Sequence, residues 1–165
     1  MSSTLVRNIG QLVTNDPEFG LRADAALIFS EGKIQWIGDH SKAPDADSVI
    51  DADGACVIPG FVDSHTHAIF AGDRLGDFVT RMNGTPYQSG GIQRTVIATR
   101  GASEDALRNH LENMTKEFTS HGITTFEIKS GYGLEIETEE RLLRIAREFT
   151  HETTFLGAHV IPPEY

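Results

Sequence analysis

The chain has 165 residues, with 14 Lys and Arg against 24 Asp and Glu, which gives a formal net charge of −10. This acidic balance argues against a general surface for nucleic acid or anionic membranes, because both partners require a positive field. A hydrophobic share of 39% and a charged share of 23% are typical of a folded globular protein and exclude a disordered chain. The length allows about one domain.

The cysteine content and the lack of long apolar runs indicate where in the cell the protein is expected. The single cysteine, Cys56, cannot form an internal disulfide, and we expect it to be a small buried apolar residue. No apolar run approaches the roughly 18–20 residues of a membrane span. The first residues also lack the basic-then-apolar order of a signal peptide. Together these features predict a cytoplasmic protein with no membrane partner.

Residues 1–57 consist of short β-like runs separated by turn residues. Glu31-Gly32, between "ALIFS" and "KIQWIG", predicts a hairpin turn, since glycine readily adopts a positive φ. The run "DADG" at 51–54 predicts a second turn. This part of the chain is therefore expected to be β-rich.

From residue 58 the pattern changes to alternating strands and helices. The expected helix at 103–122 begins with Ser103 as its N-cap and carries Leu107 and Leu111 on one face. The other expected elements are, in chain order, a strand at 60–67, a strand at 123–129, a helix at 138–149 and a strand at 153–159. Strands joined by helices predict an α/β fold with a parallel sheet.

Polar residues cluster where these expected strands end. His65 and His67 end the first strand, Ser130–Tyr132 follow the second, and His159 ends the third. Parallel sheets with helical crossovers carry their chemistry at the carboxyl ends of the strands. The clustering is therefore the first sign of a functional site.

Two histidines in "GFVDSHTH" have the spacing of a metal-binding pair. Side chains alternate along a strand, so Asp63, His65 and His67 should point the same way. Two imidazoles can hold one divalent metal ion, and they suit zinc and iron(II) equally well. Taken alone, such a pair is more often incidental surface, but this pair follows an apolar strand.

The motifs together mark a family resemblance. "IPGFVDSHTH" resembles the metal-binding signature of the amidohydrolase superfamily, and "GITTFEIKSGYGL" and "GAHVIPPEY" are similar to the imidazolonepropionase family within it. The resemblance implies an α/β fold, the N-terminal part of a TIM-like (β/α)8 barrel preceded by a small β-sandwich segment. Residues 1–57 would form the sandwich segment. Residues 58–165 would form about the first three β/α units of an incomplete barrel.

The resemblance also implies roles for five residues. His65 and His67 would be metal ligands, and Arg74, Tyr132 and His159 would bind substrate. Without the resemblance, a surface ion pair with Asp73 is favoured for Arg74 and a core position for His159. For Tyr132, a turn aromatic and a substrate neighbour are then equally favoured.

Other polar residues are given lesser roles. Asp63 is expected to be structural or to support a ligand histidine. Glu127 and Lys129 share one face of their strand and are left unassigned. The remaining histidines are expected on the surface: His40, His110, His121 and His151.

The implied reaction is hydrolysis of the cyclic amide of 4-imidazolone-5-propanoate to N-formimidoyl-L-glutamate, in histidine degradation. It would require one divalent metal ion, zinc or iron, to activate a water molecule. The substrate is a small molecule with a carboxylate, and the guanidinium of Arg74 suits that carboxylate. Another amidohydrolase, such as a deaminase or a cyclic amidase, and a catalytically inactive fragment stay open as alternatives.

Two departures from the family pattern shape the expectations. A complete barrel typically needs roughly 250 residues, whereas only about 108 follow Val57. The general base, the general acid and further metal ligands are thus expected beyond Tyr165, and this chain alone is expected to be marginally stable, aggregation-prone and inactive. The segment around Tyr87 is also shorter than usual, and a homodimer of the full-length protein is left open.

Overall fold

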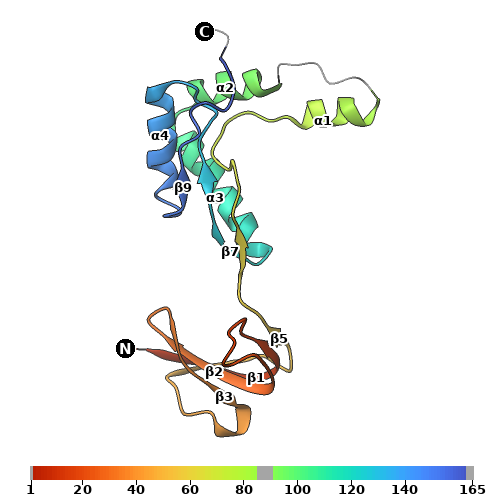
Figure 1. Ribbon diagram of the computed structural model, residues 1–165, viewed down its shortest axis with the longest axis vertical. Helices are drawn as coiled ribbons and strands as arrows, with labels where there is room; N and C mark the ends of the chain where they lie inside the picture. Colours follow the sequence, from red (N-terminus) through yellow and green to blue (C-terminus); the bar gives the residue numbers. More distant parts are fainter. Residues whose placement is uncertain (1, 85–90, 163–165) are drawn as a thin grey trace. The chain divides into compact units, whose positions relative to one another are not determined.

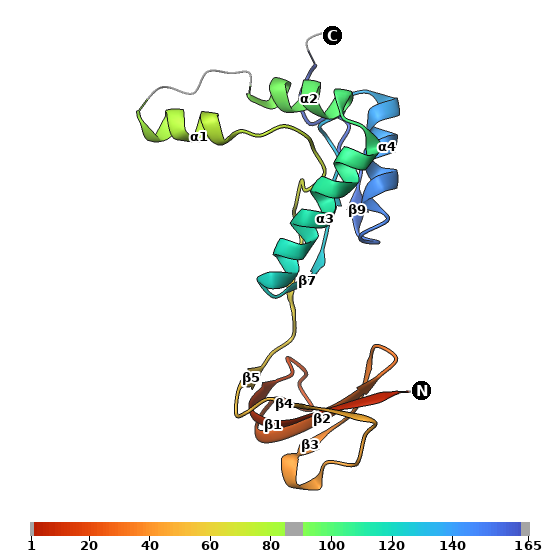
Figure 2. The same ribbon diagram turned by 180° about the vertical axis from the view of Figure 1, so that it is seen from behind.

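A computed structural model describes residues 2–84 and 91–162 of the chain. The chain divides into two compact units, Met1–Pro59 and Gly60–Tyr165. Figures 1 and 2 show the first unit as a twisted sheet and the second as a mixture of strands and helices. Tyr87 lies outside the described residues.

The first unit is a five-stranded sheet with the order β3-β2-β1-β4, and β5 also pairs with β1. The β1–β2 and β2–β3 pairs are antiparallel, whereas β4 and β5 run parallel to β1. The elements are β1 (Ser3–Val13), β2 (Leu21–Ser30), β3 (Lys33–Asp39), the 3-10 helix η1 (His40–Lys42), β4 (Ser48–Asp51) and β5 (Cys56–Val57).

The two turns predicted in this unit are confirmed. Glu31 and Gly32 both have positive φ, at 52° and 71°, in the tight β2–β3 hairpin. Asp53 and Gly54 likewise have φ values of 48° and 75°. Gly10 of β1 packs so closely on this second turn that a Cβ at position 10 would overlap the Gly54 carbonyl oxygen.

Side chains are buried on both faces of this sheet. Successive residues of β2 point to opposite faces, so Ala25 and Leu27 join one apolar cluster while Ala26 and Ile28 join another. Cys56 is exposed, so the expectation of a buried cysteine is wrong. The reason is local: Cys56 opens β5, a strand of only two residues that pairs with β1 alone.

The second unit has parallel strands joined by helices, which confirms the predicted α/β class. β6 (Phe61–Asp63) pairs with β7 (Ile123–Phe126), and β8 (Ile128–Lys129) pairs with β9 (Thr153–Thr154). The helices are α1 (Leu75–Met82), α2 (Gly91–Gly101), α3 (Glu104–Ser120) and α4 (Ile136–Ala146). No helix in the described ranges is long and apolar enough to cross a membrane.

Helix α3 anchors the core of this unit and contacts both β7 and α4 (Figure 2). Ser103 caps it by accepting a hydrogen bond from the Ala106 N–H at 3.2 Å, as predicted. Leu107 and Leu111 are fully buried against α4 and β8 residues. Burying a leucine side chain contributes about 1.5–3 kcal/mol, so this face of α3 is a major source of stability.

The strands that lead to the site are shorter than predicted. β6 ends at Asp63 instead of reaching His67, because the Asp63 carboxylate accepts the His65 N–H at 3.1 Å and turns the chain. β9 ends at Thr154, and the Leu156 N–H bonds to the Ser130 hydroxyl at 3.2 Å instead of to a neighbouring strand. His65, His67 and His159 therefore lie in loops just beyond their strands.

Helices α1 and α2 were not predicted. α1 begins directly after Arg74, and the carboxylate of Asp73 accepts the Leu75 N–H at 2.6 Å at its start. The capping carboxylate lies two residues before the helix, where a single sequence gives little warning of it.

Gly60, just before β6, allows the first two strands of this unit to approach closely. A Cβ at position 60 would overlap the side chain of Thr124 on β7. Glycine is therefore required here for packing.

Candidate functional site

Four aromatic side chains meet in the second unit: His65, His67, Tyr132 and His159, referred to below as the ring cluster. The ring centroids of His65 and His67 are 5.6 Å apart, and those of His67 and His159 are 4.9 Å apart and nearly stacked. Tyr132 lies 5.5 Å from His67 and 5.4 Å from His159. The structure thus brings together four of the five residues singled out in the sequence.

Each member of the ring cluster comes from the loop that follows a parallel strand. His65 and His67 follow β6, Tyr132 follows β8, and His159 follows β9. The loop after β6 is hydrogen-bonded to residues 127–129, which include β8. The Thr66 carbonyl oxygen accepts the Lys129 N–H at 2.8 Å, and the Thr66 hydroxyl donates to the Glu127 carbonyl oxygen at 2.5 Å. The ring cluster therefore sits at the carboxyl ends of the strands, where this fold class places its chemistry.

His67 is the most constrained of these rings. Burial lowers the pKa of its imidazole below the ordinary value, and the charges of His159, His65 and Lys129 act in the same direction. Its Nδ1 is buried and has no hydrogen-bond partner among the described residues. A neutral imidazole with an unused nitrogen is the form that binds a metal ion.

The tautomer of His159 follows from its surroundings. Its Nδ1 lies 3.1 Å from the carbonyl oxygen of Gly131, which can only accept a hydrogen bond. The Nδ1 must therefore carry a proton, which leaves Nε2 of the neutral ring as an acceptor.

A charged pair that the sequence left unassigned lies close to the ring cluster. Glu127 and Lys129 form an ion pair at 2.5 Å, and their side chains are only 17% and 16% exposed. The hydrogen bond from Lys129 holds the pKa of the Glu127 carboxyl below its ordinary value, and the charge of His65 contributes. Thr154 of β9 donates a further hydrogen bond to the same carboxylate. The alternation of 127 and 129 was the available signal for this pair, but it could not indicate which face of the strand was internal.

His110 corrects an expectation of the sequence analysis. It was expected on the surface, but it packs edge-on against Phe70 with ring centroids 4.5 Å apart. Burial lowers its pKa. Its helix runs between a strand and another helix, so a polar residue on the flank is covered. His40, His121 and His151 are exposed, as expected.

Arg74 lies at the start of α1. Its Nε is 3.4 Å from the carboxylate of Asp77, and the same carboxylate pairs with Arg94 of α2. The ion pair considered in the sequence analysis involved Asp73, whose carboxylate instead accepts the Leu75 N–H. The Arg74 side chain is 39% exposed.

The described residues do not provide a complete set of metal ligands. Among residues 2–84 and 91–162, no group of three or more His, Cys, Asp or Glu side chains is arranged to hold a metal ion. His65 and His67 would supply two of the four ligands that zinc usually takes.

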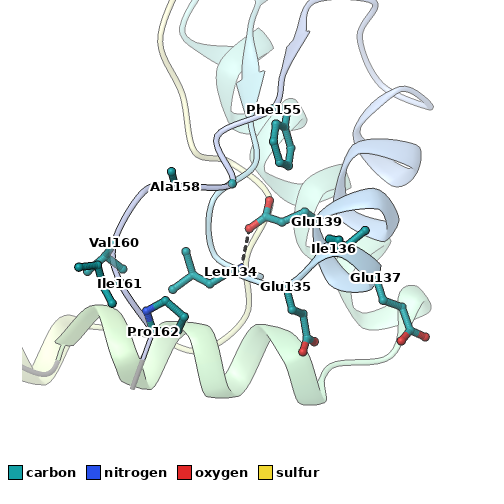
Figure 3. A pocket seen from close by; sticks show the side chains of 11 residues that line it. Leu134, Glu135, Ile136, Glu137, Glu139, Phe155, Ala158, Val160, Ile161 and Pro162 are labelled. Carbon is teal, nitrogen blue, oxygen red and sulfur yellow. Dashed lines mark hydrogen bonds between the residues drawn. The ribbon is translucent and has the colours of Figure 1, made fainter. Parts of the chain in front are cut away.

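A separate pocket of about 650 Å³ lies beside α4 and the segment after β9 (Figure 3). Its walls are mainly apolar and include Leu134, Phe155 and Ile161. None of the ring cluster lines it, so this pocket is distinct from the candidate site.

Comparison with known proteins identifies the family. The profile described as the amidohydrolase family matches residues 48–106, which include His65 and His67. An imidazolonepropionase of Mycolicibacterium smegmatis is 52% identical over 170 residues, covering 100% of this chain and 43% of the relative. One from Salinispora arenicola is 53% identical over 169 residues, with the same coverage. The chain belongs to the amidohydrolase family. It spans about 43% of the length of these curated relatives.

Solved amidohydrolase-fold structures agree with this assignment at the level of the fold. An atrazine chlorohydrolase from Arthrobacter aurescens, solved with zinc and atraton, superposes with a TM-score of 0.61 at 19% identity, over 92% of this chain and 35% of that protein. An ochratoxinase from A. niger gives 0.55 at 18% identity, over 93% and 30%. The two units of this amidohydrolase chain thus have the fold of part of a larger enzyme.

Proposed function

We propose that this amidohydrolase chain contributes to hydrolysis of 4-imidazolone-5-propanoate to N-formimidoyl-L-glutamate. The observation that carries the proposal is the ring cluster, which gathers His65, His67, Tyr132 and His159 at the ends of neighbouring parallel strands. The relatives of about 50% identity, all named imidazolonepropionase, support the choice of reaction. In this proposal the partner is a carboxylated small molecule in the cytoplasm, not a nucleic acid or a membrane.

His65 and His67 would hold one divalent metal ion, zinc or iron. The fit rests on the 5.6 Å separation of the rings and on the buried, unpartnered Nδ1 of His67 within the described residues. When bound, such an ion would act as a Lewis acid and lower the pKa of a water molecule. The Arthrobacter relative in fold was solved with zinc.

The remaining rings suit the substrate heterocycle. The Nε2 of His159 can accept a hydrogen bond from a ring N–H, because its Nδ1 already donates to Gly131. The Tyr132 hydroxyl can donate to the carbonyl of the amide that is hydrolysed. These two groups would orient the ring against His67.

Arg74 would bind the propionate. A guanidinium has five N–H groups, so Arg74 can bind a carboxylate ligand while it keeps its contact with Asp77. Two imidazoles alone leave the metal shell incomplete, so we expect the 165-residue chain to bind zinc weakly and to be inactive by itself.

A chimera tests the proposal. Residues 1–165 would replace the aligned segment of the Mycolicibacterium smegmatis imidazolonepropionase, and loss of 4-imidazolone-5-propanoate would be followed together with formation of N-formimidoyl-L-glutamate. We expect activity within about tenfold of the parent enzyme. In the chimera, H65A and H67A should each lower kcat at least about 10³-fold, whereas H151A, at an exposed position, should not. A soluble, folded chimera with no hydrolysis of this substrate would contradict the proposal, and activity on an aromatic amine instead would favour a deaminase.

A further inference from the structure

One buried carboxylate holds in place the loop that carries Tyr132, residues Ser130–Leu134. Glu139 of α4 is 1% exposed. Its Oε2 accepts the Gly131 N–H at 2.8 Å, and its Oε1 accepts the Gly133 and Leu134 N–H groups at 2.8 and 2.7 Å. Figure 3 shows Glu139 reaching from α4 to the backbone of Leu134. One side chain thus satisfies the backbone on both sides of Tyr132.

The backbone of this Tyr132 loop is in a conformation that few residues adopt freely. Gly131 has φ = 123°, and Leu134, which is not a glycine, has φ = 56°. A Cβ at Gly131 would lie 3.1 Å from the Nδ1 of His159, and one at Gly133 would lie 2.9 Å from the Glu139 nitrogen. The loop therefore needs external hydrogen bonds to keep its shape.

Glu139 is linked to the ring cluster through a single residue. Gly131 donates its N–H to Glu139, and its carbonyl oxygen accepts a hydrogen bond from the Nδ1 of His159. On the far side of Tyr132, the Arg100 Nε donates to the Gly133 carbonyl at 2.6 Å. Tyr132 is thereby fixed between two anchored glycines, with its ring near both His67 and His159.

We infer that Glu139 is a positioning residue of the candidate site: its carboxylate sets the Tyr132 loop so that Tyr132 and His159 face His67. The geometric part of this inference stands independently, and its consequence for ligand binding rests on the proposed function. Glu139 touches none of the proposed reacting groups, and it acts through the backbone of residues 131–134.

A carboxylate is suited to this task because it only accepts hydrogen bonds. A glutamine has one acceptor oxygen, and its NH2 group would face at least one of the three N–H groups. Glu139→Gln therefore keeps size and shape while it removes one anchor or more. Glu140→Gln, at an exposed neighbouring position, is the matched control for the lost charge. Leu142→Ala, at a fully buried position of the same helix, is the control for lost stability.

The experiment uses the whole 165-residue chain with zinc. Amide exchange of residues 131, 133 and 134 and the cross-relaxation between the Tyr132 and His159 rings would be measured by NMR, and the Kd of 3-(imidazol-4-yl)propionate by calorimetry. For E139Q we expect exchange of these amides at least about tenfold faster, loss of the ring cross-relaxation, and a Kd raised by about tenfold or more. E140Q and L142A should leave the ring cross-relaxation and the Kd within twofold, at a temperature where each variant is folded.

Three results would overturn the inference: unchanged exchange and ring contacts in E139Q, an equal rise in Kd in E140Q, or an equal rise in L142A. If E139Q does not fold, the unmodified chain decides. Protection of all three amides by about 100-fold or more supports the inference, and exchange near the rate of an unstructured peptide overturns it. A chain with the loop intact that binds no imidazole propionate would contradict the proposed function and leave the geometric assignment standing.

Discussion

The two units of the chain differ in what they bury. In the described part of the first unit, every buried side chain is apolar, from Leu5 and Ile9 to the run Ala25–Ile28. Among its described residues, the second unit also buries five that are polar or charged: Thr95, Thr99, Ser130, Thr138 and Glu139. Burying a polar group is unfavourable unless it is hydrogen-bonded, and each of these five side chains does have a hydrogen-bond partner. The buried polar groups of the second unit therefore fix local geometry as well as filling space.

The same contrast holds for polar atoms that lack a partner. Within the described residues, the first unit has none that are buried, whereas those of the second unit include the Nδ1 of His67, the Nε2 of His110, the Oε2 of Glu127 and the Nε of Arg141. Leaving such an atom unsatisfied costs about 1–3 kcal/mol. Two of these four atoms, on His67 and Glu127, lie at the strand ends beside the ring cluster, so part of this cost falls at the candidate site.

The largest expected effect is a loss of zinc affinity that follows substitutions in the second unit and not in the first. Replacing His65 or His67 with alanine should lower the zinc affinity of the chain at least about 100-fold, because each removes a proposed ligand. Zinc titration by calorimetry measures it. Ile9→Ala, in the core of the first unit, should destabilise the protein by about 2–5 kcal/mol and leave zinc affinity unchanged. Equal losses in both units would place the metal elsewhere.

A second prediction concerns the proposed carboxylate contact. In the chimera, Arg74→Gln should raise the KM for the propionate substrate by about 30–100-fold, since a charge-assisted bidentate pair is lost. Binding of the corresponding uncharged amide should not change. Arg22→Gln, in the first unit, is the control. Equal weakening of the charged and uncharged ligands would show that Arg74 does not bind the carboxylate.

A third prediction addresses the first unit. Gly10→Ala should lower the free energy of unfolding by about 1–3 kcal/mol, because the new methyl group would overlap the Gly54 carbonyl. Gly20→Ala, where a Cβ would meet nothing within 4 Å and only the positive φ is unfavourable, should cost about 1 kcal/mol or less. Urea denaturation distinguishes the two. A change in zinc affinity with G10A would mean that the units are not separate in function.

The smallest expected effect is a pH dependence in the second unit. Burial lowers the pKa of His110 below its unfolded value of about 6.5. Between these two pKa values the unfolded chain binds more protons, so stability should fall as pH decreases from 7.5 to below 6.5. His110→Gln should flatten this slope, and His67, whose pKa is also lowered, should retain part of it. Urea denaturation at pH 5.5 and 7.5 measures the slope. The same slope in H110Q as in the unmodified chain would contradict the prediction.

Local chemistry explains which parts of the fold could be predicted. The hairpin at Glu31-Gly32 and the start of α3 at Ser103 depend on a few adjacent residues, and both were predicted correctly. The strand ends were not, because Asp63 and Ser130 replace ladder hydrogen bonds with side-chain ones. The bond at Ser130 joins residues 26 positions apart that only the fold brings together, whereas the bond at Asp63 is a local turn in which the side chain competes with the strand.

The site shows the same division. The spacing of His65 and His67 and the motifs around Tyr132 and His159 singled out all four rings, although the expected strand did not extend that far. Glu139 was missed, because in the sequence it is one of several glutamates in an amphipathic helix. Its partners are backbone amides five to eight residues away, and no residue type marks them.

The close approach of Gly60 to Thr124 has a practical consequence for directed evolution. A library that randomises position 60 alone should return almost only glycine, since even one methyl group collides with the threonine. Randomising positions 60 and 124 together should recover alanine at 60 paired with glycine at 124, which removes every overlapping side-chain atom. Such compensating pairs, selected for activity in the chimera, would give a genetic record of the β6–β7 contact.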